Sequence, residues 1–255
     1  MTAKLEVNGL VKHFGGVQAV QGLSFEVAAG ECVALIGPNG AGKTTSFACI
    51  AGQHAPTAGS VQWAGRALDG LAPAQRLHAG VGRTFQVAQN FEALSVLQNL
   101  QLLIQAGRGL SAFDTLKARH EAQAMALLER VGLAGLARAD AANLPYGAKK
   151  RLELAMALAS APGLLLLDEP AAGLAQAERA DLMRLVLSVA REGVAVLYTE
   201  HNMDAVFGVA DRVLVLIDGK LAASGTPAQV AADPLVRSRY LGKTFTAQVQ
   251  EAIHA

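Results

Sequence analysis

An apolar run that ends in a glycine-rich loop is the feature of this sequence that most restricts its fold. The run covers residues 32–36. The residues that follow it match the pattern GxxxxGK[ST] in full: Gly37, Pro38, Asn39, Gly40, Ala41, Gly42, Lys43 and Thr44. Such a run is typical of a strand buried on both faces of a parallel sheet, and residues 43–51 predict a helix after the loop. The sequence therefore predicts an α/β fold with a strand–loop–helix unit at its centre.

The loop has the residue types that bind a phosphate group. Glycines let backbone N–H groups curl around the anion without Cβ clashes, and the following helix directs its positive N-terminal end at the same place. Lys43 adds a positive charge near the β/γ oxygens of a nucleotide such as ATP, and the Thr44 hydroxyl can bind Mg²⁺. Thr45 belongs to the same expected binding set. A chance glycine-rich turn is the alternative, and it is expected on the order of once in a hundred such chains.

A second apolar run, at 164–167, ends in two adjacent carboxylates, Asp168 and Glu169. A carboxylate at the C-terminal end of a buried strand faces the crevice where nucleotides bind in parallel sheets. We expect Asp168 to hold Mg²⁺, directly or through water, and Glu169 to act as general base on the attacking water. A strand end that simply meets solvent is the alternative.

Periodicity divides the chain into two α/β parts around a helical part. The predicted strands are 5–10, 23–27, 32–36, 164–167, 194–198 and 213–217, and the later helices are 178–191 and 203–209. Helical spacing dominates between them, with Leu97, Leu100, Leu103 and Ile104 on one face. We expect one domain over 1–242, with its core at about 1–86 and 161–242, a helical subdomain at about 87–160, and a tail at 243–255.

Composition excludes several classes of protein. The formal net charge is +1, from 22 basic and 21 acidic residues, and this balance argues against a nucleic-acid partner. No apolar run reaches the roughly 18 residues of a membrane span, and we expect no secretory signal. Cys32 and Cys49 lack a CxxC spacing and are expected to be buried thiols.

Four short stretches complete the pattern around the two apolar runs. They are Lys12-His13-Phe14-Gly15, Arg83-Thr84-Phe85-Gln86, Leu144-Pro145-Tyr146-Gly147 and Tyr198-Thr199-Glu200-His201. With these stretches, nearly the whole chain resembles the nucleotide-binding domain of ABC transporters. The resemblance implies an α/β fold in which a P-loop RecA-like core carries an N-terminal antiparallel β-subdomain and an inserted α-helical subdomain.

The resemblance also implies a role for one residue in each stretch. Phe14 would stack on adenine. Gln86 would sense the γ-phosphate, contribute to the Mg²⁺ site and couple to a permease, one helix of which would lie near residues 86–91. His201 would contact the γ-phosphate and orient the attacking water, so Glu169, His201 and Gln86 form the expected catalytic set.

The third stretch stands at the signature of this family. By resemblance, Leu144, Tyr146 and Gly147 would contact the ATP that a second cassette holds, because two such chains close head to tail. The implied partners are therefore ATP, a second ABC ATPase subunit in a homodimer or heterodimer, and membrane permease subunits.

Within the family, the chain is similar to the ATPases of branched-chain amino acid uptake systems, the Liv type. The form Leu-Pro-Tyr-Gly and residues 171–174 and 240–242 suggest this subgroup, and residues 83–86 make the chain LivG-like, with a LivF-like partner. This implies uptake of branched-chain amino acids or a related small polar solute such as urea, delivered by an extracytoplasmic binding protein. The chain would be peripheral, on the cytoplasmic face of a bacterial plasma membrane. The alternative is a soluble ABC-family ATPase that does not act in transport.

Three residues depart from the family pattern. Pro145 replaces the signature serine, so no hydroxyl is available there for a phosphate. Ala148 replaces the usual glutamine. Ala175 stands where the family commonly has an aspartate or asparagine that hydrogen-bonds across the dimer. We therefore expect a weakened ATP site where this chain supplies the signature.

Overall fold

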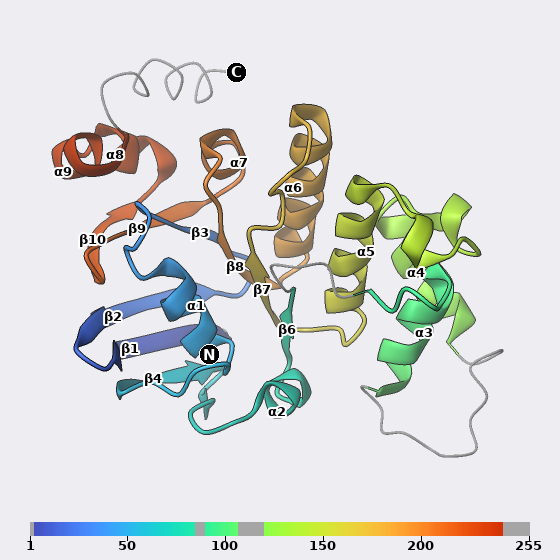
Figure 1. Cartoon of the computed structure of the whole chain (residues 1–255), viewed down its shortest axis with the longest axis horizontal. Coiled ribbons are helices and arrows are strands. Elements are labelled where there is room, and N and C mark those ends of the chain that lie inside the picture. The colour runs from blue at the N-terminus through green and yellow to red at the C-terminus, as the bar shows by residue number, and fades with distance from the viewer. Residues whose placement is uncertain (1–2, 85–89, 107–119, 242–255) are drawn as a thin grey trace.

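The computed structural model describes residues 3–84, 90–106 and 120–241, and a six-stranded sheet runs through it (Figure 1). In order across the sheet, the strands are β10 Lys220–Gly225, β9 Arg212–Ile217, β3 Cys32–Ile36, β8 Ala195–Thr199, β7 Leu164–Asp168 and β6 Val81–Arg83. The strands from β9 to β6 are parallel, and β10 runs antiparallel to β9. The predicted strand at 32–36 is confirmed, and the later predicted strands are correct to within one residue at each end.

A four-stranded antiparallel sheet lies beside the central sheet. Its strands, in order, are β2 Val17–Ala28, β1 Lys4–Phe14, β4 Ala58–Trp63 and β5 Arg66–Ala67. The sequence predicted only the most apolar parts of the first two strands. Both strands are longer because they continue as a hairpin through polar residues to the turn at Gly15. This sheet is the expected N-terminal β-subdomain.

Strand β3 contributes to the cores on both faces of the central sheet, as its continuous apolar run predicted. Val33 and Leu35 pack on the side of the four-stranded sheet, together with Phe47 from α1 (Lys43–Ile50). Cys32, Ala34 and Ile36 pack on the other side, against α6 (Gln176–Arg191) and α7 (Met203–Phe207). Full burial of one such large apolar side chain contributes roughly 1.5–3 kcal/mol. Both cysteines are buried free thiols, as expected.

Three helices form a separate lobe with its own core. They are α3 (Val96–Ala106), α4 (Glu121–Arg130) and α5 (Tyr146–Leu158). The predicted apolar face of α3 is correct: Leu100 and Ile104 are fully buried, and Leu97 and Leu103 pack partly against the same cluster. The Gly-Arg-Gly stretch at 107–109, which predicts a loop, lies outside the described residues.

The sequence did not predict the short elements at the edges of the molecule. Helix α2 (Pro73–His78) precedes β6, and α8 (Pro227–Ala232) and α9 (Pro234–Val236) follow β10 and are succeeded by a π-helical turn, Arg237–Leu241. Helix α8 does carry a start signal, because Thr226 caps it with Gln229 in a capping box and Pro227 opens it. Within the described residues, no helix has the length and apolar character to span a membrane.

Candidate nucleotide site

Strand order places the two predicted nucleotide motifs next to each other. Strand β8 lies between β3 and β7, and all three are parallel, so their C-terminal ends share one edge of the sheet. The glycine-rich loop follows β3, Asp168 ends β7 with Glu169 directly after it, and His201 follows β8. This edge is where ligands bind in parallel α/β sheets.

Two glycines of the loop cannot be replaced without moving the backbone. A Cβ atom on Gly37 would lie 2.1 Å from the carbonyl oxygen of Leu216, and one on Gly42 would lie 2.3 Å from that of Ala19. Gly42 also has a φ of +94°, which other residues rarely adopt. The close packing of the loop against β2 and β9 therefore explains why the pattern needs glycine at both positions.

Lys43 begins α1 and folds back over the loop. Its ammonium group donates hydrogen bonds to the carbonyl oxygens of Gly37 at 2.7 Å and Pro38 at 3.0 Å. Burial lowers the pKa of Lys43, and the charge of Glu169 opposes this shift. The ammonium group is thus held over the loop with little water around it, a setting that favours an anionic ligand.

The other residues of the loop differ in their exposure. Asn39, Gly40 and Thr44 are exposed, Pro38 and Thr45 are half-buried, and Ala41 is buried. The Thr44 hydroxyl, at the start of α1, is thus accessible to a ligand.

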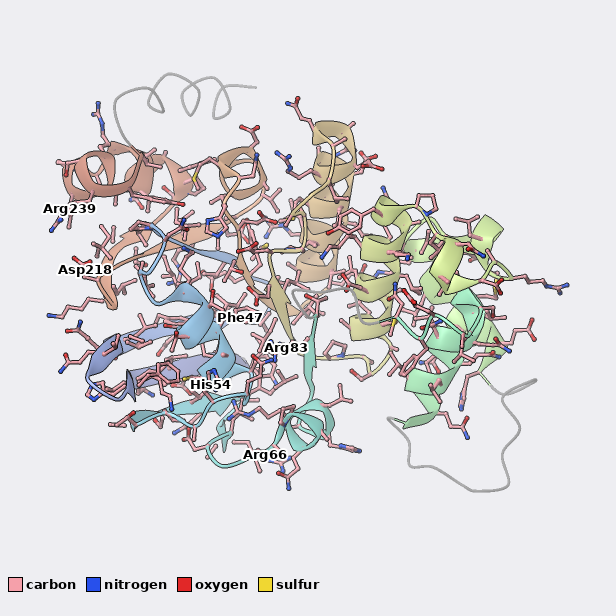
Figure 2. The ribbon with its side chains drawn as sticks, in the orientation of Figure 1. Phe47, His54, Arg66, Arg83, Asp218 and Arg239 are labelled. Atoms are coloured by element: carbon pink, nitrogen blue, oxygen red, sulfur yellow. The ribbon has the colours of Figure 1, made fainter. Side chains whose placement is uncertain are left out.

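Asp168 is buried at the end of β7. Its Oδ1 accepts a hydrogen bond of 2.7 Å from the Thr199 hydroxyl, on the neighbouring strand. Arg83 in β6 is close enough for the Asp168 charge to act on its pKa, and it extends toward Phe47 of α1, with its guanidinium 5.9 Å from the ring (Figure 2). Carboxylate and hydroxyl oxygens are ligands that Mg²⁺ prefers, so Asp168 and Thr44 fit this ion chemically.

Glu169 has an unusual backbone conformation for a non-glycine residue. Its φ is +48°, and its N–H donates to both the carbonyl oxygen and the hydroxyl of Thr199, at 3.2 and 3.1 Å. Its carboxylate lies 2.8 Å from Nε2 of His201. Such strained residues cluster at functional sites, where the surrounding structure holds them in place. The expected general base, Glu169, and His201, which is expected to orient the attacking water, are therefore in direct contact.

The sequence did not predict a role for Thr199. Its hydroxyl donates to the Asp168 carboxylate and accepts from the backbone N–H of Glu169. The pattern offered a signal for it, because Thr199 is a polar residue at the end of an otherwise apolar strand, two positions before His201. Its importance depends on β8 lying beside β7, which no local pattern specifies.

Phe14 ends β1 at the hairpin next to the loop. Its ring is 45% exposed, with His54 edge-on at 5.5 Å between centroids and the Lys12 ammonium 4.9 Å from the ring centre. Strand β2 begins opposite Phe14, and its Ala19 touches Gly42. An exposed ring beside the loop is suited to stacking on a base.

The signature residues lie at the start of helix α5. Tyr146 is exposed, and its hydroxyl donates a 3.2 Å hydrogen bond to the carbonyl oxygen of Ala172. A Cβ on Gly147 would lie 2.7 Å from a carboxylate oxygen of Glu178, so a larger residue there would require the exposed Glu178 side chain to move. Leu144 has its side chain buried in the core of the helical lobe. Gln86 lies outside the described residues.

Fold and site together define a P-loop ATPase cassette. The model of the family described as ABC transporter matches residues 20–172, and the chain belongs to that family as one of its ATP-hydrolysing cassettes. Chain and relatives correspond along almost their whole lengths, as the following comparisons show.

The chain is 40% identical to the high-affinity branched-chain amino acid transport ATP-binding protein LivG of Salmonella typhimurium, over 94% of the chain and 98% of that protein. It is 39% identical to the corresponding protein BraF of Pseudomonas aeruginosa, with the same coverage. A solved ATP-binding cassette of an ABC transporter, in its ADP conformation, has a TM-score of 0.84 and 29% identity, covering 95% of this chain and 100% of that one.

Proposed function

We propose that this chain hydrolyses ATP to drive uptake of branched-chain amino acids, or of a related small polar solute such as urea, through a membrane permease. The identity of 40% to LivG along nearly the full length of both chains supports this most directly. The shared edge of the sheet, with Lys43, Asp168 and Glu169, supplies the groups that ATP hydrolysis needs.

In the proposed reaction, Glu169 accepts a proton from water as the water oxygen attacks the γ-phosphorus and ADP leaves. His201, 2.8 Å from Glu169, would orient this water and contact the γ-phosphate. The Lys43 ammonium would release its hydrogen bonds to the two loop carbonyl oxygens and donate instead to the β- and γ-phosphate oxygens of ATP. Mg²⁺, bound by Thr44, Asp168 and the undescribed Gln86, would neutralise phosphate charge. Phe14 would stack on adenine.

Two cassettes would form the working unit, in a homodimer or with a LivF-like partner. Helix α5 begins at the exposed Tyr146, and backbone N–H groups at a helix start suit an anion. Gly147 and the backbone at Leu144 would thus face the γ-phosphate held by the partner.

A cavity of about 310 Å³ between the core and the helical lobe is the proposed docking site for a permease helix. Its lining is mainly apolar, with Leu103 and Met156 from the helical lobe and Arg83 from β6. Phe91, 44% exposed, is among its lining residues. Residues 85–89 lie between Thr84 and Phe91, both of which line the cavity, so the undescribed Gln86 is connected to it through the chain.

We further propose that the two lobes belong to one domain over residues 1–242, with 243–255 as a tail. Its core would comprise about 1–86 and 161–242, and the helical lobe about 87–160. In this arrangement the chain would be peripheral, on the cytoplasmic face of a bacterial plasma membrane, and would respond through the permease to an extracytoplasmic binding protein.

Reconstitution tests this function. We expect ATP turnover to rise when the chain is assembled with its permease and partner ATPase, and to rise further with liganded binding protein. Leucine and urea, each with its own binding protein, distinguish the solute classes. A turnover that does not respond to the permease would instead favour the alternative, a soluble ABC-family ATPase.

We expect the two ATP sites of a heterodimer to hydrolyse at different rates when the partner carries the signature serine. Pro145 caps α5 without a side-chain hydrogen bond, so the partner's nucleotide loses one hydroxyl donor. A hydrogen bond to a charged group contributes about 1.5–3 kcal/mol, roughly ten- to a hundred-fold, and the Gly147 N–H offsets part of it. Blocking each catalytic glutamate in turn and measuring the residual ATPase checks this; equal residual rates would contradict it.

A further inference from the structure

One buried acidic residue beside the proposed catalytic pair has no role in the function proposed so far. Glu200 lies between Thr199, the last residue of β8, and His201. Only 3% of it is exposed. Acidic residues are seldom buried to this degree unless specific partners satisfy their charge.

The partners of Glu200 are backbone N–H groups from two separate loops. Oε1 accepts a 2.8 Å hydrogen bond from the N–H of Ala171, in the loop after β7. Oε2 accepts one of 3.2 Å from the N–H of His201, and the N–H of Asn202 also bonds to the carboxylate. One carboxylate therefore joins the loop after β7 to the loop after β8.

These two loops hold the two members of the proposed catalytic pair. Ala171 is two residues after Glu169, and His201 is the residue after Glu200. The imidazole of His201 reaches the Glu169 carboxylate at 2.8 Å, although half of its surface is open to solvent. A long-range constraint on both backbones limits how far this exposed ring can move from its partner.

The ionised form of Glu200 is held at a cost. Burial raises the pKa of Glu200, while hydrogen bonds from Ala171, His201 and Asn202 act in the opposite direction. Glutamine is neutral and of the same size, so it would avoid this burial penalty. Its NH₂ group is a donor, however, and could not accept a hydrogen bond from the backbone N–H groups that it would face. The carboxylate is therefore suited to gathering several backbone donors at one point.

We propose that Glu200 is a positioning residue for ATP hydrolysis, which fixes the loops of Glu169 and His201 relative to each other. The proposal rests on the function proposed above, because it assigns Glu200 to the same reaction. Glu200 itself does not touch the substrate. It acts through His201, whose loop it joins to the backbone after Glu169.

Glu200→Gln separates its two sets of bonds. The amide oxygen can accept from the N–H of Ala171 or from that of His201 but not from both, because the amide nitrogen on the other side is a donor and cannot accept. We expect the kcat for ATP hydrolysis to fall about 10- to 100-fold, the loss typical of a hydrogen bond to a charged group. The KM for ATP should change less than about two-fold, because the glycine-rich loop that holds the phosphates is not altered.

Steady-state hydrolysis by the full chain over a range of ATP concentrations measures both quantities. Glu129→Gln, an exposed glutamate on α4, is the matched control and should behave as the unaltered protein. Thermal unfolding of each variant shows that folded protein is being compared. An unaltered chain that does not hydrolyse ATP would contradict the proposed function itself. If the unaltered protein hydrolyses ATP and the Glu200→Gln variant is fully active as well, only the proposed role of Glu200 is overturned.

A double-mutant cycle with His201→Ala distinguishes positioning from general support of the fold. If Glu200 acts through His201, Glu200→Gln should have little further effect on the single-turnover rate once the imidazole is removed. Equal effects in both backgrounds would overturn the proposal. If Glu200→Gln fails to fold, Glu200→Asp keeps the charge but shortens the reach to Ala171, and the same fall in kcat at unchanged KM is expected. Normal turnover in that variant would likewise overturn it.

Discussion

Glu169→Gln should lower ATP turnover at least about 100-fold and leave ATP binding intact, because the amide cannot accept the proton of the attacking water. The substitution keeps the shape of the side chain. The strained backbone at Glu169 should persist, since its N–H is held by Thr199 and not by its own carboxylate. Phosphate release during steady-state hydrolysis measures turnover, and titration with a fluorescent ATP analogue measures binding.

The same variant should accumulate as a dimer with ATP trapped at its interface. Size-exclusion chromatography with and without ATP detects this dimer. Glu129→Gln, on the exposed side of α4, provides the control for the change of charge. Hydrolysis at the normal rate in Glu169→Gln would show that another group activates the water. His201, whose Nε2 lies 2.8 Å from the Glu169 carboxylate, is the first candidate.

Lys43→Ala should abolish measurable ATP binding. In the proposed site the lysine ammonium would bind the phosphates, and two hydrogen bonds to charged oxygens contribute about 3–6 kcal/mol, or about 100- to 10,000-fold in affinity. Titration with the same fluorescent analogue measures the loss. Lys220→Ala, an exposed lysine of β10, is the control.

The ammonium group of Lys43 also holds two loop carbonyls, so its removal could disturb the loop without ligand. Lys43→Met keeps the buried aliphatic chain and removes only the charge and the donors. It should lose ATP binding as Lys43→Ala does, with thermal unfolding close to that of the unaltered chain. Affinity near that of the unaltered protein in either variant would contradict the assignment of the loop.

Local sequence patterns predicted the elements whose character lies within a few residues. The apolar run at 32–36 is a strand with those bounds, and α3 follows the predicted helical spacing. Strands β4 and β10 were missed because they mix small and polar residues and have one exposed side. Such strands are stabilised by their neighbours in the sheet and not by their own composition.

The identity of most site residues also lies in local patterns, because a phosphate loop needs glycine, lysine and a hydroxyl at a fixed spacing. By itself, the sequence determined the family, and it predicted the phosphate loop at 37–44 and the metal-binding and base roles of Asp168 and Glu169. The tertiary structure decided that β8 lies between β3 and β7. That order brings Thr199 onto the carboxylate of Asp168 and the backbone N–H of Glu169, and brings Glu200 onto the backbone after Glu169. Strand order depends on packing between segments far apart in the chain, which local periodicity does not encode.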